Sequence, residues 1–172
     1  MTSYMKNIFA LILVTIVFFS CNTNEKEMSS IDPVNWEKRA VKINTNDSLI
    51  YGETYLSIYS QIYSYTEHMT HDLTSTISMR NTSVTDTIYM ISAKYFDTHG
   101  KLIRTYFEKP IYIEPMETVA IVIDEVDQEG GTGANFLFDW AIKSQTTEPI
   151  FEGVQLSTAG RISFTTHGVR LK

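Results

Sequence analysis

The sequence predicts an all-β fold, an immunoglobulin-like antiparallel β-sandwich of about 8–9 strands. Ten tyrosines and nine phenylalanines, with many threonines and isoleucines, favour strands. Short segments that alternate apolar and polar residues recur about every 8–12 residues, with turn-forming residues between them. No amphipathic segment of helical period and useful length follows the N-terminal apolar run, so we expect the fold to be built from sheets.

The N-terminus has the pattern of a bacterial lipoprotein signal peptide. Lys6 supplies a positive charge, and the apolar run at 8–19 has 12 residues, whereas a membrane-spanning helix needs about 20. Ser20 and Cys21 follow this run directly and resemble a lipoprotein cleavage site, although Phe18 stands where leucine is usual. A plain signal peptide or an uncleaved anchor is the alternative.

Cys21 is the single cysteine, so it forms no disulfide within the chain. Lipidation there would tie the mature chain to a membrane. The next residue is Asn22 rather than aspartate, which by the enterobacterial sorting rule favours the outer membrane. We expect three parts: a signal peptide (1–20), a lipidated cysteine with a flexible tether and an N-terminal arm (21–50), and a β-sandwich domain (51–172).

The mature chain would be acidic. Without its first 20 residues it has 172 − 20 = 152 residues, 14 − 1 = 13 bases and 20 acids, hence a net charge of −7. Nucleic acid and anionic lipid need clustered lysines and arginines, and the nearest cluster is Lys38-Arg39. We therefore expect no nucleic acid and no cofactor. The expected partners are a membrane, through the lipid anchor, and an envelope protein.

Alternation and turn residues place the expected strands. They lie at 54–63, 73–81, 88–96, 102–107, 111–113, 117–124, 136–143, 150–156 and 161–166. The turn Asp97-Thr98-His99-Gly100 predicts a hairpin with glycine in the left-handed conformation. Trp36 lies in a short helix or an extended arm, and we expect its side chain to dock on the domain.

Tyrosines give two strands a distinctive face. In 54–63, Tyr55, Tyr59 and Tyr63 share one face, which is partly buried, covers a sheet edge or forms a binding face. An exposed edge there would favour self-assembly. The same alternation predicts a shared face in 88–96 for Tyr89, Ile91, Ala93 and Tyr95.

Seven short motifs punctuate this pattern. They are Arg80-Asn81-Thr82, Tyr95-Phe96-Asp97, Gly100-Lys101, Pro115-Met116-Glu117-Thr118, Gly130-Gly131-Thr132-Gly133-Ala134-Asn135-Phe136, Trp140 and Ile162-Ser163-Phe164-Thr165. Together they resemble the bacterial family called domain of unknown function 3124, over residues 51–168. The resemblance implies a secreted or lipid-anchored single domain and no known activity.

Residues 124–135, here the glycine loop, form the most unusual segment. Gly130, Gly131 and Gly133 permit left-handed conformations and close backbone approach. The loop lacks the Gly-Lys-Ser/Thr ending and the following helix of a phosphate loop, and it lacks the helix of a dinucleotide fingerprint. Two interpretations stay open: the glycines form a binding surface, or they let the backbone pass a core aromatic such as Trp140.

Acidic residues crowd the start of the glycine loop. Asp124, Glu125, Asp127 and Glu129 lie within six residues, and together with Asn135 they echo calcium-binding loops. However, the twelfth position of an EF-hand loop, a bidentate Glu, is occupied by Phe136, and the calcium-binding nonapeptide works only in repeats. The alternatives are a calcium site and a solvated acidic loop.

His68 and His71 form the one close pair of histidines, in a predicted loop before a strand. They are weak candidates for metal ligands, because zinc needs three or four. No strained serine elbow is visible either, so we expect no catalytic residues. The leading hypothesis is a non-catalytic, lipid-anchored binding or envelope-assembly module. The alternative is a metal-dependent hydrolase or calcium-binding module that uses His68, His71 and the glycine loop.

Overall fold

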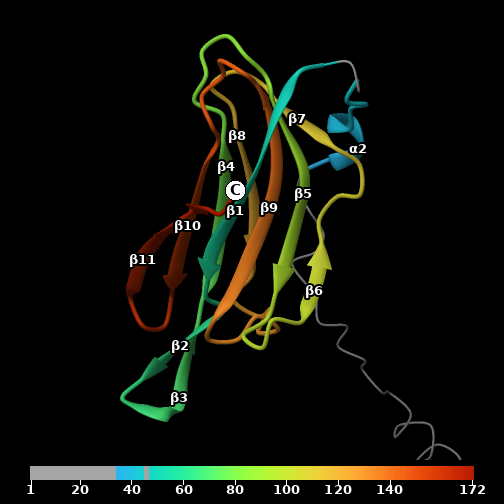
Figure 1. The fold of residues 1–172 in the computed structure, drawn as a ribbon. Helices are drawn as coiled ribbons and strands as arrows, with labels where there is room; N and C mark the ends of the chain where they lie inside the picture. The colour runs from blue at the N-terminus through green and yellow to red at the C-terminus, as the bar shows by residue number, and fades with distance from the viewer. Residues whose placement is uncertain (1–33, 45–46) are drawn as a thin grey trace, which may run out of the picture.

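The computed structural model describes residues 34–44 and 47–172, so the predicted signal peptide, Cys21 and the segment 22–33 lie outside the described residues. The described chain is an antiparallel β-sandwich (Figure 1), which confirms the all-β prediction. Its elements are α2 (Trp36–Arg39), β1 (Leu49–Ile58), β2 (Gln61–Ser64), β3 (Thr66–Asp72), β4 (Thr74–Arg80), β5 (Ile88–Phe96), β6 (Leu102–Thr105), β7 (Ile111–Ile113), β8 (Thr118–Ile123), β9 (Ala134–Lys143), β10 (Ile150–Ser157), β11 (Ile162–His167) and β12 (Val169–Arg170). No helix in this part of the chain is long and apolar enough to cross a membrane.

Two sheets face each other. The front sheet has the order β12-β1-β9-β5-β6, and β7 also pairs with β5; the back sheet has the order β11-β10-β4-β8. Strands β2 and β3 pair only with each other, and this hairpin, here the finger, projects beyond one end of the sandwich (Figure 1). The described chain has twelve strands rather than 8–9, because the finger and the two-residue β12 carry no clear alternation.

Aromatic side chains join the two sheets. Phe136, Phe138, Trp140 and Ile142 of β9 are all buried on its inner face, as their alternation predicted. Phe138 stacks on Phe136 at a centroid distance of 5.3 Å and on Phe151 of the back sheet at 4.4 Å. Stacked rings therefore run from one sheet into the other and fix their spacing.

The predicted strand at 54–63 is wrong. Strand β1 ends at Ile58, and the chain bends at Tyr59 and Ser60 before entering the finger. The backbone N–H groups of Ser60 and Gln61 both donate to the carbonyl of Gly131 at 3.1 Å. These two N–H groups bond to the glycine loop and not to a neighbouring strand, so the strand ends there. The expected tyrosine face is therefore divided between β1 and the finger.

The predicted shared face in β5 is also wrong. The register with β9 shifts between Met90 and Ser92, which leaves one extra residue in β5. Tyr89 consequently lies on the outer face of the sheet, whereas Ala93 and Tyr95 are buried on the inner face. A bulge of this kind reverses the alternation, and nothing in the local residue pattern announces it.

Residues 34–44, here the arm, lie against the edge of the front sheet. The Asn35 side chain accepts a hydrogen bond from Lys38 N at 3.1 Å and caps α2. Trp36 packs against Phe107 with ring centroids 5.2 Å apart, which confirms the expected docking of this side chain. Ala40 then forms an antiparallel bridge with the first residue of β7.

Candidate functional site

The glycine loop packs tightly at the finger end of the sandwich. A Cβ on Gly130 would lie 1.9 Å from Tyr95 Oη and 2.8 Å from Ser60 Oγ. Those two hydroxyl groups are buried and hydrogen-bonded to each other at 2.9 Å, and burial raises the pKa of Tyr95. The aromatic ring that the loop passes is therefore Tyr95; Trp140 is instead approached by Gly52.

Thr98 fastens the glycine loop to the turn between β5 and β6. Its backbone N and its Oγ1 donate to the carbonyl of Gly130 at 3.2 and 3.0 Å, and its Oγ1 accepts from Gly133 N at 2.9 Å. Gly131 has a φ of +68°, which a residue with a side chain adopts only with strain. Gly131 is thus needed for its left-handed backbone conformation, and Thr98 hydrogen-bonds to the residues on both sides, Gly130 and Gly133.

The turn that carries Thr98 is stabilised by its own aspartate. The Asp97 carboxylate accepts hydrogen bonds from His99 N at 2.8 Å and Lys101 N at 2.9 Å. The bond from Lys101 N is the main cause that lowers the pKa of Asp97, and the bond from His99 N adds to it. Gly100 has a φ of +77°, which confirms the predicted left-handed glycine.

Arg104 of β6 is paired with the acidic part of the loop. Its Nη2 lies 3.0 Å from Asp127 Oδ2 and 3.3 Å from Glu129 Oε2. The Asp127 side chain is fully buried, and Asp124 and Glu125 lie on the solvent side of the loop. A guanidinium thus occupies the position a calcium ion would need beside Asp127 and Glu129. Among the described residues, no three His, Cys, Asp or Glu side chains are grouped to hold a metal.

His68 and His71 lie within β3 of the finger, and not in a loop before a strand as predicted. His68 is exposed beside Glu67, and His71 pairs across the finger with Ile62. The base of the finger meets the glycine loop, because Gln128 Nε2 donates to Asp72 Oδ2 at 2.8 Å. The structure therefore brings the two predicted candidate regions close together.

The finger exposes apolar side chains, of which only Tyr63 was considered as part of a binding face from the sequence. Tyr65 at its tip is 96% exposed, Tyr63 is 61% exposed and Met69 is also exposed. Tyr65 has a φ of +59°, so this large side chain is held in a left-handed conformation. Only the segment Ile62-Tyr63 had suggested a strand here, because the rest of the finger is polar.

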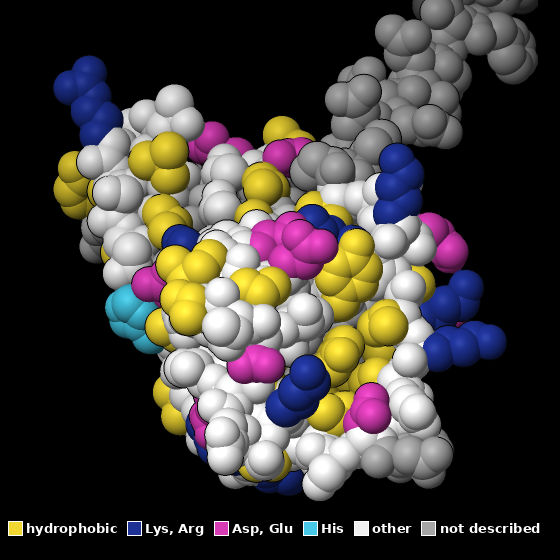
Figure 2. Space-filling view, turned by 90° about the horizontal axis from the view of Figure 1, so that it is seen from above, with side chains coloured by type: hydrophobic (Ala, Val, Ile, Leu, Met, Phe, Trp, Pro, Cys, Tyr) yellow, Lys and Arg dark blue, Asp and Glu magenta, His cyan; other side chains and the backbone are white. Residues whose placement is uncertain are grey.

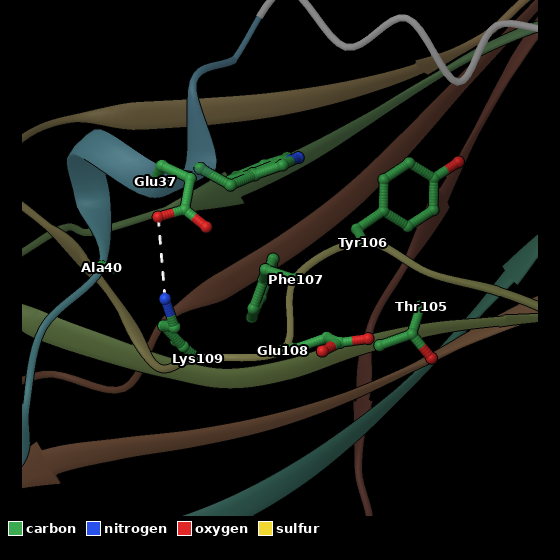
Figure 3. Close-up of a pocket in the computed structure, with 8 residues that line it drawn as sticks. Glu37, Ala40, Thr105, Tyr106, Phe107, Glu108 and Lys109 are labelled. Atoms are coloured by element: carbon green, nitrogen blue, oxygen red, sulfur yellow. Dashed lines mark ion pairs between the residues drawn. The ribbon is translucent and has the colours of Figure 1, made fainter.

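Two of the cavities beside the arm adjoin residues 105–110. One, of about 390 Å³, is lined by Trp36, Glu37, Ala40 and residues 105–109, and an ion pair of 3.7 Å joins Glu37 to Lys109 across it (Figure 3). The other, of about 690 Å³, lies between residues 40–43 and 109–110. Figure 2 looks onto the end of the sandwich away from the finger and shows hydrophobic side chains in a hollow strip with Lys and Arg near it.

An ion pair clamps the arm to the turn between β7 and β8. Arg39 Nη2 and Nη1 lie 2.5 and 3.0 Å from the two carboxylate oxygens of Glu117. The hydrogen bond from Arg39 is the main cause that lowers the pKa of Glu117. Glu117 also accepts from Glu114 N at 2.8 Å, so one carboxylate orders both the turn and the arm.

The comparisons with known proteins agree with the predicted resemblance. A family sequence model described as "Protein of unknown function (DUF3124)" matches residues 51–171. No curated protein matches the chain. Among solved structures, the chain is similar to the "Crystal Structure of Thermotoga maritima 1070", with 11% sequence identity, 69% of this chain and 92% of that chain covered, and a TM-score of 0.44.

Proposed function

Because the chain belongs to the DUF3124 family, whose description states no activity, we propose a function from its own surfaces. The protein is a membrane-anchored bacterial lipoprotein that acts as a non-catalytic binding module of the cell envelope. The finger is the surface that contacts its partner, an envelope protein. The observation that carries this proposal is the firmly based hairpin that displays Tyr65 at 96% exposure.

The hairpin is well suited to recognition because its base is ordered and its tip is free. Ser60 N and Gln61 N donate to Gly131, and Gln128 donates to Asp72, so the glycine loop holds the base from two sides. An exposed aromatic side chain on an ordered support gains contact area at little cost in conformational entropy. The glycine loop therefore has a positioning role in this proposal.

The position of the finger favours a protein partner over the anchoring lipid surface. The finger and the arm lie at opposite ends of the sandwich (Figure 1). Twelve residues (22–33) separate Cys21 from the arm, and the chain enters the domain at Val34, next to α2, which lies beside β7 and away from the finger (Figure 1). Glu67 of the finger is acidic, and so are Asp124 and Glu125 of the glycine loop, which meets the base of the finger, so we expect a partner with basic side chains around an apolar groove.

Capture from membranes tests this proposal. A photo-reactive amino acid at position 65 of the full lipoprotein should cross-link one envelope protein, and Tyr65→Ala should abolish its capture. Tyr51→Ala is the matched control, because Tyr51 and Tyr63 are both 61% exposed but only Tyr63 belongs to the finger. We expect Tyr63→Ala to weaken capture and Tyr51→Ala to leave it unchanged. Equal capture by the wild type and Tyr65→Ala would exclude the finger as the contact.

The anchor needs its own measurement. Metabolic labelling with a radioactive fatty acid should label the wild type and leave Cys21→Ser unlabelled, and the variant should leave the membrane fraction. Labelling that persists in Cys21→Ser would disprove lipidation at this residue without affecting the finger experiment.

A further inference from the structure

A row of tyrosines crosses the outer face of the front sheet. Strand pairing places Tyr51 of β1 opposite Ala141 of β9, Ala141 opposite Tyr89 of β5, and Tyr89 opposite Tyr112 of β7. Adjacent strands are about 4.8 Å apart, so this row, here the tyrosine row, extends about 14 Å at right angles to the strands. Tyr51 lies near the start of β1, whereas the finger follows the end of that strand, so the row lies away from the finger.

The tyrosines flank a covered position. Ala141 lies on the outer face, between Tyr51 and Tyr89, yet it is 0% exposed. Its short side chain is covered by larger neighbours, and Tyr51 remains 61% exposed. Arg39 lies over the Tyr112 ring, 5.9 Å from its centroid, and fixes the far end of the row.

A row of polar side chains runs parallel to the tyrosine row, with Glu53 of β1 opposite Asp139 of β9 and Asp139 opposite Ser92 of β5. Asp139 Oδ2 accepts from Ser92 Oγ at 2.6 Å and from Lys94 Nζ at 3.3 Å. Glu53, opposite Asp139, pairs with Lys172 at 3.1 Å. The carboxylates of this row already have cationic partners, so the face offers hydrogen-bonding groups with little net charge.

The tyrosine row ends in a small polar pocket. A cavity of about 330 Å³ is lined by Tyr112 together with Val34, Asn35, Lys38 and Arg39 of the arm. Among the described residues no carboxylate is paired with Lys38, so its ammonium can donate to a ligand. The arm thus adds hydrogen-bond donors at the end of the tyrosine row.

We propose that the tyrosine row is a binding site for an extended, neutral, β-1,4-linked glycan that crosses the strands. Sugar rings with equatorial substituents have flat faces of C–H groups that stack on aromatic rings, and hydroxyl groups at their edges that need hydrogen bonds. Tyr51 and Tyr89 supply the rings, whereas Arg39 covers the ring of Tyr112. The parallel polar row and the Lys38 pocket supply the hydrogen-bonding partners. This site does not depend on the finger or on a lipid anchor.

Charge complementarity favours this occupant over others. A nucleic acid or an anionic polymer needs uncompensated lysines and arginines, but Lys94 and Lys172 are paired with carboxylates. A lipid surface needs an aliphatic face, whereas here the rings carry hydroxyl groups. A neutral ligand with many hydroxyl groups fits a face in which polar groups are numerous and the charged side chains, apart from Lys38, are paired.

Titration calorimetry with hexasaccharides tests the site on the mature chain that carries Cys21→Ser. The probes are β-1,4-linked glucose, β-1,4-linked N-acetylglucosamine and, as the comparison, α-1,4-linked glucose. We expect at least one β-linked probe to bind and the α-linked probe to bind at least tenfold more weakly. Tyr51→Ala should weaken binding about tenfold, a loss of about 1.4 kcal/mol, because it removes one of the stacking rings. Tyr51→Phe should retain most of the affinity.

Tyr63→Ala is the matched control, equal to Tyr51 in exposure but placed on the finger. It should bind the glycan as the wild type does. In partner capture the expectation is the opposite, because there Tyr63→Ala weakens capture and Tyr51→Ala does not. Because Tyr51 is largely exposed, its truncation should not unfold the domain, and an unchanged melting temperature verifies this. Binding of no β-linked probe, or binding that Tyr51→Ala and Lys38→Ala both leave unchanged, would overturn the proposal.

Discussion

The glycine loop and the finger meet at one end of the sandwich, but they differ in almost every physical respect. The loop is glycine-rich and acidic in sequence, and in the structure its backbone fits against Tyr95 while its acids meet Arg104. The finger has an unremarkable sequence, and it holds an almost fully exposed tyrosine in a left-handed conformation. The glycines and acids that stand out in the sequence are needed for packing inside the molecule. The exposed apolar surface belongs to the finger beside them.

The contrast shows how far a residue pattern can indicate a site. Glycines and clustered acids indicate that a segment has special packing or charge requirements. Here Tyr95 leaves no room for a side chain at Gly130, Thr98 hydrogen-bonds to the loop, and Arg104 pairs with its acids. A site for a partner is recognised instead by features that no contact within the chain explains, such as an exposed aromatic side chain and a strained backbone conformation.

The largest test of this contrast is Gly130→Ala. The added Cβ would lie 1.9 Å from Tyr95 Oη, so the buried Tyr95–Ser60 pair must move, and we expect a loss of about 3 kcal/mol in the free energy of unfolding. Gly133→Ala is the control, because its Cβ would lie 3.4 Å from Thr98 Cγ2 and should cost less than about 1 kcal/mol. Chemical denaturation measures both. Equal losses would mean that the loop is not packed as described.

A second test removes the cation that compensates the loop. Arg104→Met leaves the buried Asp127 without its guanidinium partner, and we expect a loss of about 2 kcal/mol. Arg80→Met is the matched control, because Arg80 pairs with Glu152 where the side chains are 43% and 31% exposed, against 12% and 0% for Arg104 and Asp127, and we expect a loss of about 1 kcal/mol or less. Adding Asp127→Asn to Arg104→Met should restore part of the loss. No recovery would show that Asp127 does not depend on the charge of Arg104.

A third test concerns the finger and has the opposite sign. Tyr65→Gly replaces a left-handed, exposed tyrosine with the residue that adopts this conformation freely, so we expect a gain of about 0.5 kcal/mol in stability. Partner capture should be lost in the same variant. Thermal unfolding together with the cross-linking assay checks both, and a lower melting temperature would contradict the described backbone.

The smallest expected effect is that of calcium. Arg104 already pairs with Asp127 and Glu129, which leaves Asp124 and Glu125 as the loop carboxylates without that partner, too few for a calcium ion that takes 6–8 oxygen ligands. We expect millimolar calcium to leave the melting temperature unchanged and to give no heat in calorimetry. A saturable upward shift would restore calcium binding as a function of the glycine loop.

Most of the fold could be predicted, because alternation along a strand depends on residues two positions apart. β9 and β8 bury the residues that their alternation selects, and Gly100 has its expected conformation. The failures occur where contacts from distant segments intervene. The carbonyl of Gly131 draws Ser60 N out of the strand pattern, and the bulge at Ile91 reverses the faces of β5.

The candidate surfaces were less predictable for the same reason. The sequence suggested a tyrosine row along one strand, whereas the structure forms a row across four strands from Tyr51, Ala141, Tyr89 and Tyr112. Such a row depends on strand order and register, and its members lie up to 90 positions apart in the chain (141 − 51). The partner of the acidic loop, Arg104, is likewise set by packing and not by spacing.

The clamp between Arg39 and Glu117 has a mechanical consequence. A force that pulls on the N-terminal side of the domain reaches this ion pair and the bridge at Ala40 before it reaches β1, whose ladder with β9 carries ten paired positions. We therefore expect the arm to detach from the sandwich before the ladder between β1 and β9 opens. The released segment 34–48 would span at most about 50 Å when fully extended, and the sandwich would stay intact.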